Sequence, residues 1–152
     1  MGRTTLNLSI SKRLRPAFAV AAIVAVAVVV TACSGGSGLT GKTWQLTAVT
    51  EKVPAFQGVV PPDQQANYTI AFKDDGNAEI KADCNQVGAA YTTSGSNITI
   101  TLGPSTLMAC PEGSMADQYL AGLAAAQTYA INGDQLKMTL ANEGTLEFTA
   151  AK

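Results

Sequence analysis

The feature that most constrains the fold is a series of short segments with alternating apolar and polar residues, separated by turn signals from about residue 42 to the end of the chain. The predicted strands are 42–49, 68–72, 78–82, 89–93, 97–102, 128–131, 135–140 and 145–149. The turns between them are rich in Asp, Asn, Ser and Gly, at 74–77, 94–96, 132–134 and 142–144. Residues of these types tolerate the backbone conformations of tight hairpins. About eight strands at this spacing predict an antiparallel curved sheet or small barrel.

Alternation within the strands predicts which side chains face the core. In the first strand, the period of two places Trp44, Leu46 and Ala48 on one face. In the last strand it places Leu146 and Phe148 on one face. We expect these faces to point inward, because one face of an antiparallel sheet usually packs on the core.

The segment at about 114–126 departs from the period of two and predicts one amphipathic helix. Ser114 followed by Asp117 fits a capping box at a helix start. Gly122 weakens the helix somewhat. The apolar residues at helical spacing are Met115, Tyr119, Leu120 and Leu123. One helix among about eight strands makes the predicted class α+β and sheet-dominated.

Residues 50–67 contain three prolines and no clear period. A long connection without secondary structure in a small domain is usually functional or disordered. Two interpretations stay open for its apolar residues, Phe56, Val59 and Val60. They fold back and cover the core, or they form a surface loop that offers apolar side chains to a partner.

The N-terminal segment has the three parts of a secretory signal. Residues 1–15 are basic, residues 17–30 are an uninterrupted apolar run, and a small residue precedes Cys33. A membrane-spanning helix is the alternative, but it needs about 20 apolar residues and this run is shorter. The sequence Val30-Thr31-Ala32-Cys33 resembles a bacterial lipobox. The resemblance implies cleavage before Cys33 and a diacylglycerol attached to its sulfur.

These features predict three parts of the chain: a signal peptide at 1–32, a lipidated Cys33 with a Gly- and Ser-rich tether at 33–38, and a folded domain at 39–152. The predicted location is the cell membrane, on its extracytoplasmic side, with the lipid anchor as the membrane contact. After residue 32, six basic residues remain against eleven acidic ones, which is a formal net charge of −5. This charge argues against nucleic acid as a partner, because phosphate binding requires clustered basic residues.

Cys84 and Cys110 are the two cysteines that remain after Cys33 is assigned to the lipid. An even number of cysteines in an exported chain favours a disulfide. Closing a loop of this length would stabilise the domain by roughly 3–4 kcal/mol. The alternative is a metal or redox site, which the spacing disfavours because the chain has no histidine and no Cys-x-x-Cys pair.

Several short motifs together resemble the META domain family, which includes the HslJ-type heat-shock lipoproteins. The resemblance rests on Cys84-Asn85, Gly88, Tyr91, Ile98-Thr99-Ile100, Thr106-Leu107-Met108-Ala109-Cys110, and Tyr119-Leu120 with Leu123. It also rests on the opening 39–46 and on the closing elements 129–136 and 144–148. The family often has Gly before the Cys-Asn pair, where this sequence has Asp83.

The resemblance implies a compact β-rich domain that is generally extracytoplasmic. The family is linked to stress response and antibiotic tolerance and, by structural likeness, to the small pilot lipoproteins of secretion systems. No agreed biochemical activity belongs to it, so the resemblance indicates architecture and location more than function.

The residue types offer little catalytic chemistry, and we expect no catalytic residue, no cofactor and no metal. Serine and cysteine triads of the usual kind need a histidine, which the chain lacks. Asp74 and Asp75 fall in a predicted turn, where Asp serves the backbone. Asp83 is the acid beside the Cys-Asn motif, and a hydrolase that depends on Asp83 and Asp75 is a minor hypothesis.

The remaining candidates are contact residues. Asn85 could hydrogen-bond its own turn or bind a ligand. Four further residues could belong to the core or line a pocket: Trp44, Tyr91, Phe56 and Met108. The preferred function is a non-enzymatic, membrane-tethered module with an envelope protein as partner. The alternative is a binder of small molecules or peptides that uses the sheet face or barrel mouth, with residues 50–67 as a lid.

Overall fold

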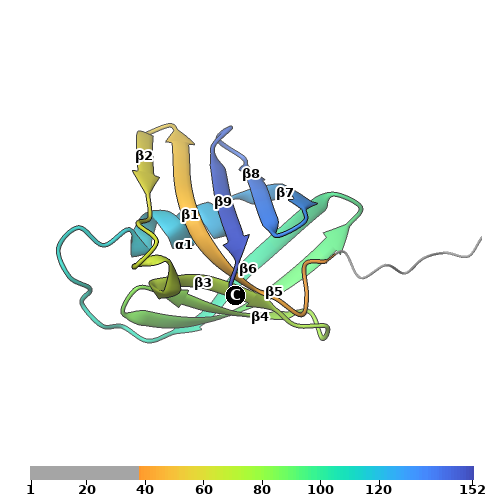
Figure 1. The fold of residues 1–152 in the computed structure, drawn as a ribbon, viewed down its shortest axis with the longest axis horizontal. Helices are drawn as coiled ribbons and strands as arrows, with labels where there is room; N and C mark the ends of the chain where they lie inside the picture. The colour runs from red at the N-terminus through yellow and green to blue at the C-terminus, as the bar shows by residue number, and fades with distance from the viewer. Residues whose placement is uncertain (1–37) are drawn as a thin grey trace, which may run out of the picture. The chain divides into compact units, whose positions relative to one another are not determined.

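A computed structural model describes residues 38–152, in which antiparallel strands surround one α-helix (Figure 1). The predicted signal peptide and the lipid site at Cys33 lie outside the described residues. In chain order the elements are β1 (Thr43–Lys52), β2 (Ala55–Val59), the 3₁₀ turn η1 (Gln65–Asn67), β3 (Tyr68–Phe72), β4 (Asn77–Ala82), β5 (Asn85–Ser94), β6 (Asn97–Ser105), α1 (Ala116–Ala124), β7 (Ala126–Asn132), β8 (Gln135–Leu140) and β9 (Thr145–Ala150).

Eight of the strands form a closed antiparallel barrel. The strands pair in the order β2-β1-β3-β4-β5-β6-β7-β8-β9, and β1 also pairs with β9, which closes the sheet. At one edge of β1, residues 43–45 pair with β3 and residues 48–52 pair with β2. Strand β2 therefore extends the barrel wall as a hairpin with β1. The α+β, sheet-dominated prediction is confirmed, and so is each of the eight predicted strands.

The hairpin turns form where the sequence predicts them. Gly76, Gly95 and Gly133 have φ values of 82°, 59° and 61°, which is the left-handed region that glycine adopts without strain. The Asp75 carboxylate accepts a hydrogen bond from the backbone N–H of Asn77 at 3.0 Å. This bond lowers the pKa of Asp75 below its ordinary value. Asp75 thus serves the turn, as its position in the sequence suggests.

The inward face of β1 differs from the simple alternation. Trp44 and Leu46 are fully buried as predicted, but Ala48 is half-buried and Val49 takes the inward position. The reason is a register shift against β9 between Leu46 and Ala48, which is a β-bulge. One extra residue in a strand moves every later side chain to the other face.

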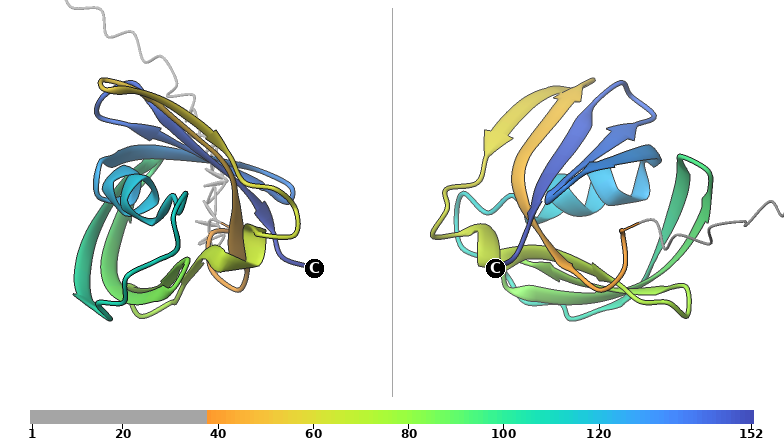
Figure 2. Two further views of the ribbon diagram at one scale, coloured as in Figure 1. Left: turned by 90° about the vertical axis from the view of Figure 1, so that its left-hand side faces the viewer. Right: turned by 45° about the vertical axis from the view of Figure 1, so that its right-hand side comes forward.

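The helix is shorter than predicted, and the capping box is wrong. Helix α1 begins at Ala116, and Met115 at its N-cap makes no side-chain cap bond. The Ser114 hydroxyl lies one residue before the N-cap and accepts the N–H of Ala116 at 3.2 Å, while Asp117 is exposed. Figure 2 shows α1 within the curve of the strands. No helix among residues 38–152 has the length and apolar character to span a bilayer.

The segment 50–67 is more ordered than its composition suggests. Residues 50–52 continue β1, β2 pairs with them in a hairpin, and η1 follows. The prediction of an irregular connection is therefore wrong for much of its length, because pairing with β1 overrides its weak pattern. Val60 is buried and Phe56 packs against the core, whereas Val59 is 71% exposed. Two of the three apolar residues cover the core.

Gly122 lets the helix approach the barrel wall. A Cβ at this position would lie 2.9 Å from Leu146 Cδ2, and Leu146 is fully buried and cannot move aside easily. We expect Gly122→Ala to lower the free energy of unfolding by about 1–2 kcal/mol, because overpacking outweighs the better helix propensity of Ala. Urea unfolding measures this change. A more stable Gly122→Ala protein would contradict the packing described here.

Tyr119 is fully buried, and its hydroxyl has no hydrogen-bond partner among the described residues. Its ring packs edge-on against Tyr68, with centroids 6.1 Å apart. We expect Tyr119→Phe to leave the free energy of unfolding unchanged at pH 7 or to raise it by up to about 1 kcal/mol, because no bond is lost and a polar group no longer needs desolvation.

At alkaline pH we expect a larger difference in the free energy of unfolding between the native protein and Tyr119→Phe. Burial raises the pKa of Tyr119 well above its ordinary value, so above about pH 10 the unfolded chain releases a proton that the folded chain keeps. This difference lowers stability by about 1.4 kcal/mol per pH unit, and Tyr119→Phe should lack that contribution. Denaturant titrations from pH 8 to 11 measure it, and identical pH profiles for both proteins would contradict the burial of the hydroxyl.

Candidate functional site

A disulfide ties the turn between β4 and β5 to the segment that follows β6. Cys84 and Cys110 are bonded at 1.99 Å with Cα atoms 5.4 Å apart, which confirms the predicted disulfide. Cys110 is the last of five residues, 106–110, that follow β6, and we call this segment the disulfide loop. Because β5 and β6 already form a long hairpin, the disulfide fixes the loop at the end of two paired strands.

The Asn85 side chain binds the disulfide loop rather than its own turn. Its Oδ1 accepts hydrogen bonds from the backbone N–H of Met108 at 2.8 Å and from the Thr106 hydroxyl at 3.0 Å. Its Nδ2 donates to the Met108 carbonyl at 3.0 Å. Both amide atoms are thus occupied within the protein, and Asn85 positions the loop.

Thr106 adds a second attachment at the start of the loop. Its hydroxyl accepts the backbone N–H of Gln86 at 3.0 Å, and its own N–H donates to the Gln86 carbonyl at 3.0 Å. The disulfide loop is therefore fixed at Thr106, Met108 and Cys110. Alternate residues of a five-residue loop are held, which leaves its backbone little freedom.

The fixed loop carries two apolar side chains into solvent. Leu107 is 95% exposed and Met108 is 60% exposed, although both are large hydrophobic residues. Isolated exposed apolar residues are ordinary on protein surfaces, but adjacent ones on a rigid loop are typical of binding surfaces. The sequence motif contains both residues, yet sequence reasoning did not identify Leu107 as a contact. A signal was available, because Leu107 and Met108 lie between a strand and a helix and follow neither period.

Asp83 adopts a left-handed backbone conformation immediately before Cys84. Its φ is 56°, in the left-handed region, at the position where the resembled family often has Gly. Asp is one of the residue types that tolerate this conformation. The Tyr68 hydroxyl donates to the Asp83 carboxylate at 3.3 Å and accepts the backbone N–H of Met115 at 3.1 Å. The turn at Asp83 is thereby joined to the start of α1.

A pocket of about 350 Å³ separates the disulfide loop from the start of α1. It is lined by Asn85, Met108, Ala109, Cys110, Pro111, Gly113, Ser114, Ala116, Asp117 and Leu120. The exposed surface within it is mainly polar, in contrast to the exposed apolar side chains of Leu107 and Met108 on the disulfide loop. The disulfide, Asn85 and the helix start therefore meet in one concave region.

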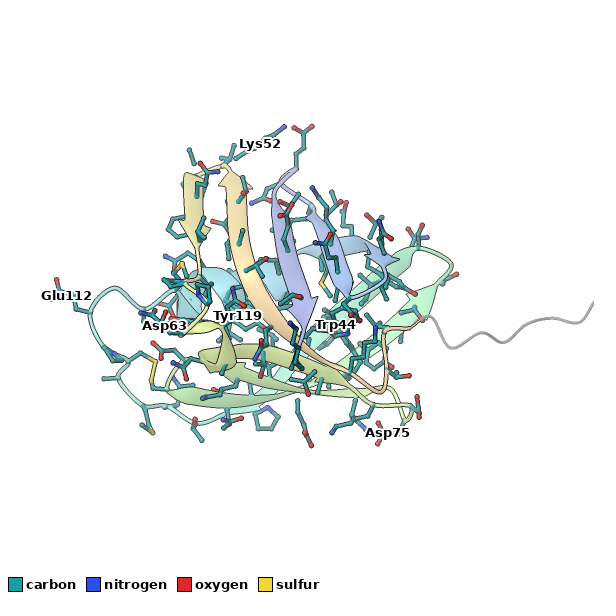
Figure 3. All side chains as sticks on the ribbon, in the orientation of Figure 1. Trp44, Lys52, Asp63, Asp75, Glu112 and Tyr119 are labelled. Atoms are coloured by element: carbon teal, nitrogen blue, oxygen red, sulfur yellow. A yellow bond between two sulfur atoms is a disulfide. The ribbon has the colours of Figure 1, made fainter. Side chains whose placement is uncertain are left out.

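Acidic residues without ion pairs surround this region. In the described part of the chain, the four ion pairs join Lys42 to Asp134, Lys52 to Glu143, Lys73 to Glu79 and Lys137 to Glu147. Asp63, Asp83, Glu112 and Asp117 take part in none of them. Figure 3 places Asp63 and Glu112 at the same end of the domain. At this end of the domain these acids outnumber Lys81, whose ammonium binds the Asn67 side chain.

The predicted aromatic contacts do not gather at this site. Trp44 is fully buried, and its Nε1 donates to the Leu39 carbonyl at 2.8 Å. Tyr91 packs edge-on against Phe72 and donates its hydroxyl to the Lys73 carbonyl at 2.7 Å. Phe56 is half-buried against the core. Of the predicted contact residues, the structure brings Asn85 and Met108 together with the two cysteines.

The two candidate carboxylates also lie apart. Asp75 is in the turn that follows β3, whereas Asp83 hydrogen-bonds through its N–H to the Asn67 carbonyl, next to the start of β3. They therefore lie at opposite ends of β3. Among residues 38–152, no three His, Cys, Asp or Glu side chains gather as metal ligands.

Comparisons with known proteins bear on the family and the fold. The sequence model of the META domain family matches residues 37–152. None of the curated proteins that were compared matches the chain.

Solved structures resemble the fold. A protein from Burkholderia xenovorans, solved by NMR, has 24% identity and a TM-score of 0.61, covering 75% of this chain and 84% of its own. A DUF4847 family protein from Bacteroides vulgatus has 14% identity and a TM-score of 0.52, covering 73% and 93%. These likenesses concern the fold alone.

Proposed function

The chain belongs to the META domain family, and from this premise we propose that it is a lipid-anchored binding module on the extracytoplasmic side of the cell membrane. Its work is recognition of an envelope protein, in the setting of stress or antibiotic tolerance that the family resemblance implies. The disulfide loop is the contact surface in this proposal, and Cys33 is the anchor.

The observation that carries the proposal is the rigid presentation of Leu107 and Met108. Exposed apolar side chains contribute little to the stability of the free domain, yet Asn85 and the disulfide hold the backbone of Leu107 and Met108 in place. Binding through such a loop costs less conformational entropy than binding through a mobile one. Adjacent large apolar residues at the tip of an element are suited to fill a pocket on a partner.

Binding of a small molecule, with residues 50–67 as a lid, has less support. That segment forms a hairpin with β1 for much of its length. Another pocket of about 360 Å³, beside β7, β8 and β9, is lined by Ile131, Leu136 and Phe148, but it contains neither this segment nor Trp44, Tyr91 or Phe56.

The anchor is tested by Cys33→Ala. We expect this variant to accumulate as uncleaved precursor that no longer incorporates labelled fatty acid, because the thiol is the only group at that position that accepts the lipid. Metabolic labelling and the mobility of the mature protein on gels measure both effects. Normal maturation of Cys33→Ala would contradict the anchor, and Ser34→Ala is the control that should mature normally.

Recognition is tested by crosslinking in living cells followed by mass spectrometry. We expect one reproducible envelope protein to be captured by the native lipoprotein and to be lost from the variant Leu107→Ser/Met108→Ser. Both side chains are exposed, so the fold of the variant should be unchanged and its circular dichroism should match. Equal capture by both proteins would contradict the disulfide loop as the contact surface.

A further inference from the structure

The described chain begins at one end of the domain. The backbone of Gly38 lies beside Ile131, since an added Cβ would be 3.9 Å from that side chain. Lys42 binds the β7–β8 turn through the Gly133 carbonyl and the Asp134 carboxylate. Thr40 pairs with Phe72, the last residue of β3. The chain thus starts beside the β7–β8 turn and the end of β3.

The disulfide loop lies at the opposite end. Asp83 is bonded to Asn67, just before the start of β3, and Cys84 follows it. Strand β5 then runs from Asn85 at this end to Ser94 at the other. Figure 1 agrees, because the segment between β6 and α1 projects on the side away from the point where the described chain begins.

The short tether limits how far the end of the domain near Gly38 can lie from the membrane. This step rests on the proposed anchor at Cys33. The six residues from Cys33 to Gly38 are joined by five peptide bonds and can span no more than about 18 Å. The end of the domain near Gly38 then stays within that distance of the membrane, whereas Leu107 and Met108 lie at the opposite end of the domain.

We infer that the partner is a protein segment with an apolar pocket flanked by lysine or arginine. Leu107 and Met108 enter the pocket, and a basic side chain of the partner lies in the polar pocket between the disulfide loop and α1, near Asp117.

Charge and position both favour this partner over a lipid surface. Four acids without ion pairs lie at this end. Lys81 also lies at this end, where its ammonium binds the Asn67 side chain and the Ala66 carbonyl, but the four acids outnumber this one cation. A negative rim repels anionic headgroups, whereas it attracts a basic protein segment and speeds its association. The loop also lies at the end of the domain opposite Gly38, where the tether to the lipid anchor joins it.

The experiment places a photoreactive amino acid at position 108 of the full-length chain in living cells and sequences the crosslinked peptides. Position 92 is the control, because Thr92 is exposed on β5 outside the loop. We expect adducts from position 108, and not from position 92, that map to a protein segment with Lys or Arg close to the crosslinked residue. Glu112→Lys and Asp117→Asn should each lower the adduct yield about three- to tenfold. Asp74→Lys, an exposed acid in the turn after β3, should leave it unchanged.

The outcomes distinguish a failure of the partner chemistry from a failure of the proposed contact surface. Adducts at position 108 that map to lipid or to segments without basic residues, or yields that Glu112→Lys and Asp117→Asn do not change, would overturn the partner chemistry while the loop remains a contact surface. The absence of any adduct at position 108 would overturn the proposed function together with the partner chemistry.

Discussion

Replacing Trp44 by Ala is expected to lower the free energy of unfolding by about 4 kcal/mol. The side chain is fully buried, and truncating a buried aromatic residue typically costs about 3–5 kcal/mol in lost packing and cavity formation. The replacement also leaves the carbonyl of Leu39, itself a fully buried residue, without its indole donor. A change of this size is a large part of the total stability of a single domain.

Trp44 has this effect because of its place in the barrel. It pairs with Ile70 in β3 and with Ala150 in β9, so it lies where β1 closes the sheet. Urea unfolding of the domain measures the change. Trp44→Phe is the matched control, since it keeps much of the apolar volume and should cost clearly less. A loss below about 1 kcal/mol in Trp44→Ala would contradict the burial described here.

Removing the disulfide with Cys84→Ser/Cys110→Ser is expected to lower the free energy of unfolding by about 3–4 kcal/mol. The bond spans 26 residues, and a cross-link of that span restricts the unfolded chain by about this amount. Urea unfolding with and without reductant measures the effect. Reductant should shift the native protein toward the double variant and leave the variant unchanged. Equal stability of the native and reduced proteins would contradict a stabilising role for the bond.

The local elements of the fold could be predicted from the sequence because their signals are local. Turn residues at Gly76, Gly95 and Gly133 mark hairpins whatever the rest of the chain does. The bulge in β1 could not be predicted in this way, because it depends on the register between Leu46 and Ala48 and the partner strand β9. Strand β2 was missed for a similar reason, since its pairing with β1 stabilises a segment with little pattern of its own.

The site was predicted only in part. Cys84, Cys110 and Asn85 could be identified from their spacing and the family motif, and the structure brings them together. The contact between Asn85 and Met108 spans 23 residues, so no local pattern reveals it. Trp44 is a residue type that is common in binding pockets, but its position on β1 places it in the core. Leu107 follows neither the strand period nor the helix period, which marks it as a loop residue, but its exposure depends on what the folded domain leaves uncovered.

The central claim is that the disulfide loop is rigid in the free protein, and backbone NMR relaxation tests it most directly. The account predicts order parameters near 0.85 for the amides of Leu107 and Met108, as in the strands. In Asn85→Ala, which keeps the disulfide but removes the three hydrogen bonds to Thr106 and Met108, these values should fall toward 0.6 or below. Order parameters below 0.6 in the native protein would contradict the claim, because Leu107 and Met108 would then not form a fixed surface for a partner.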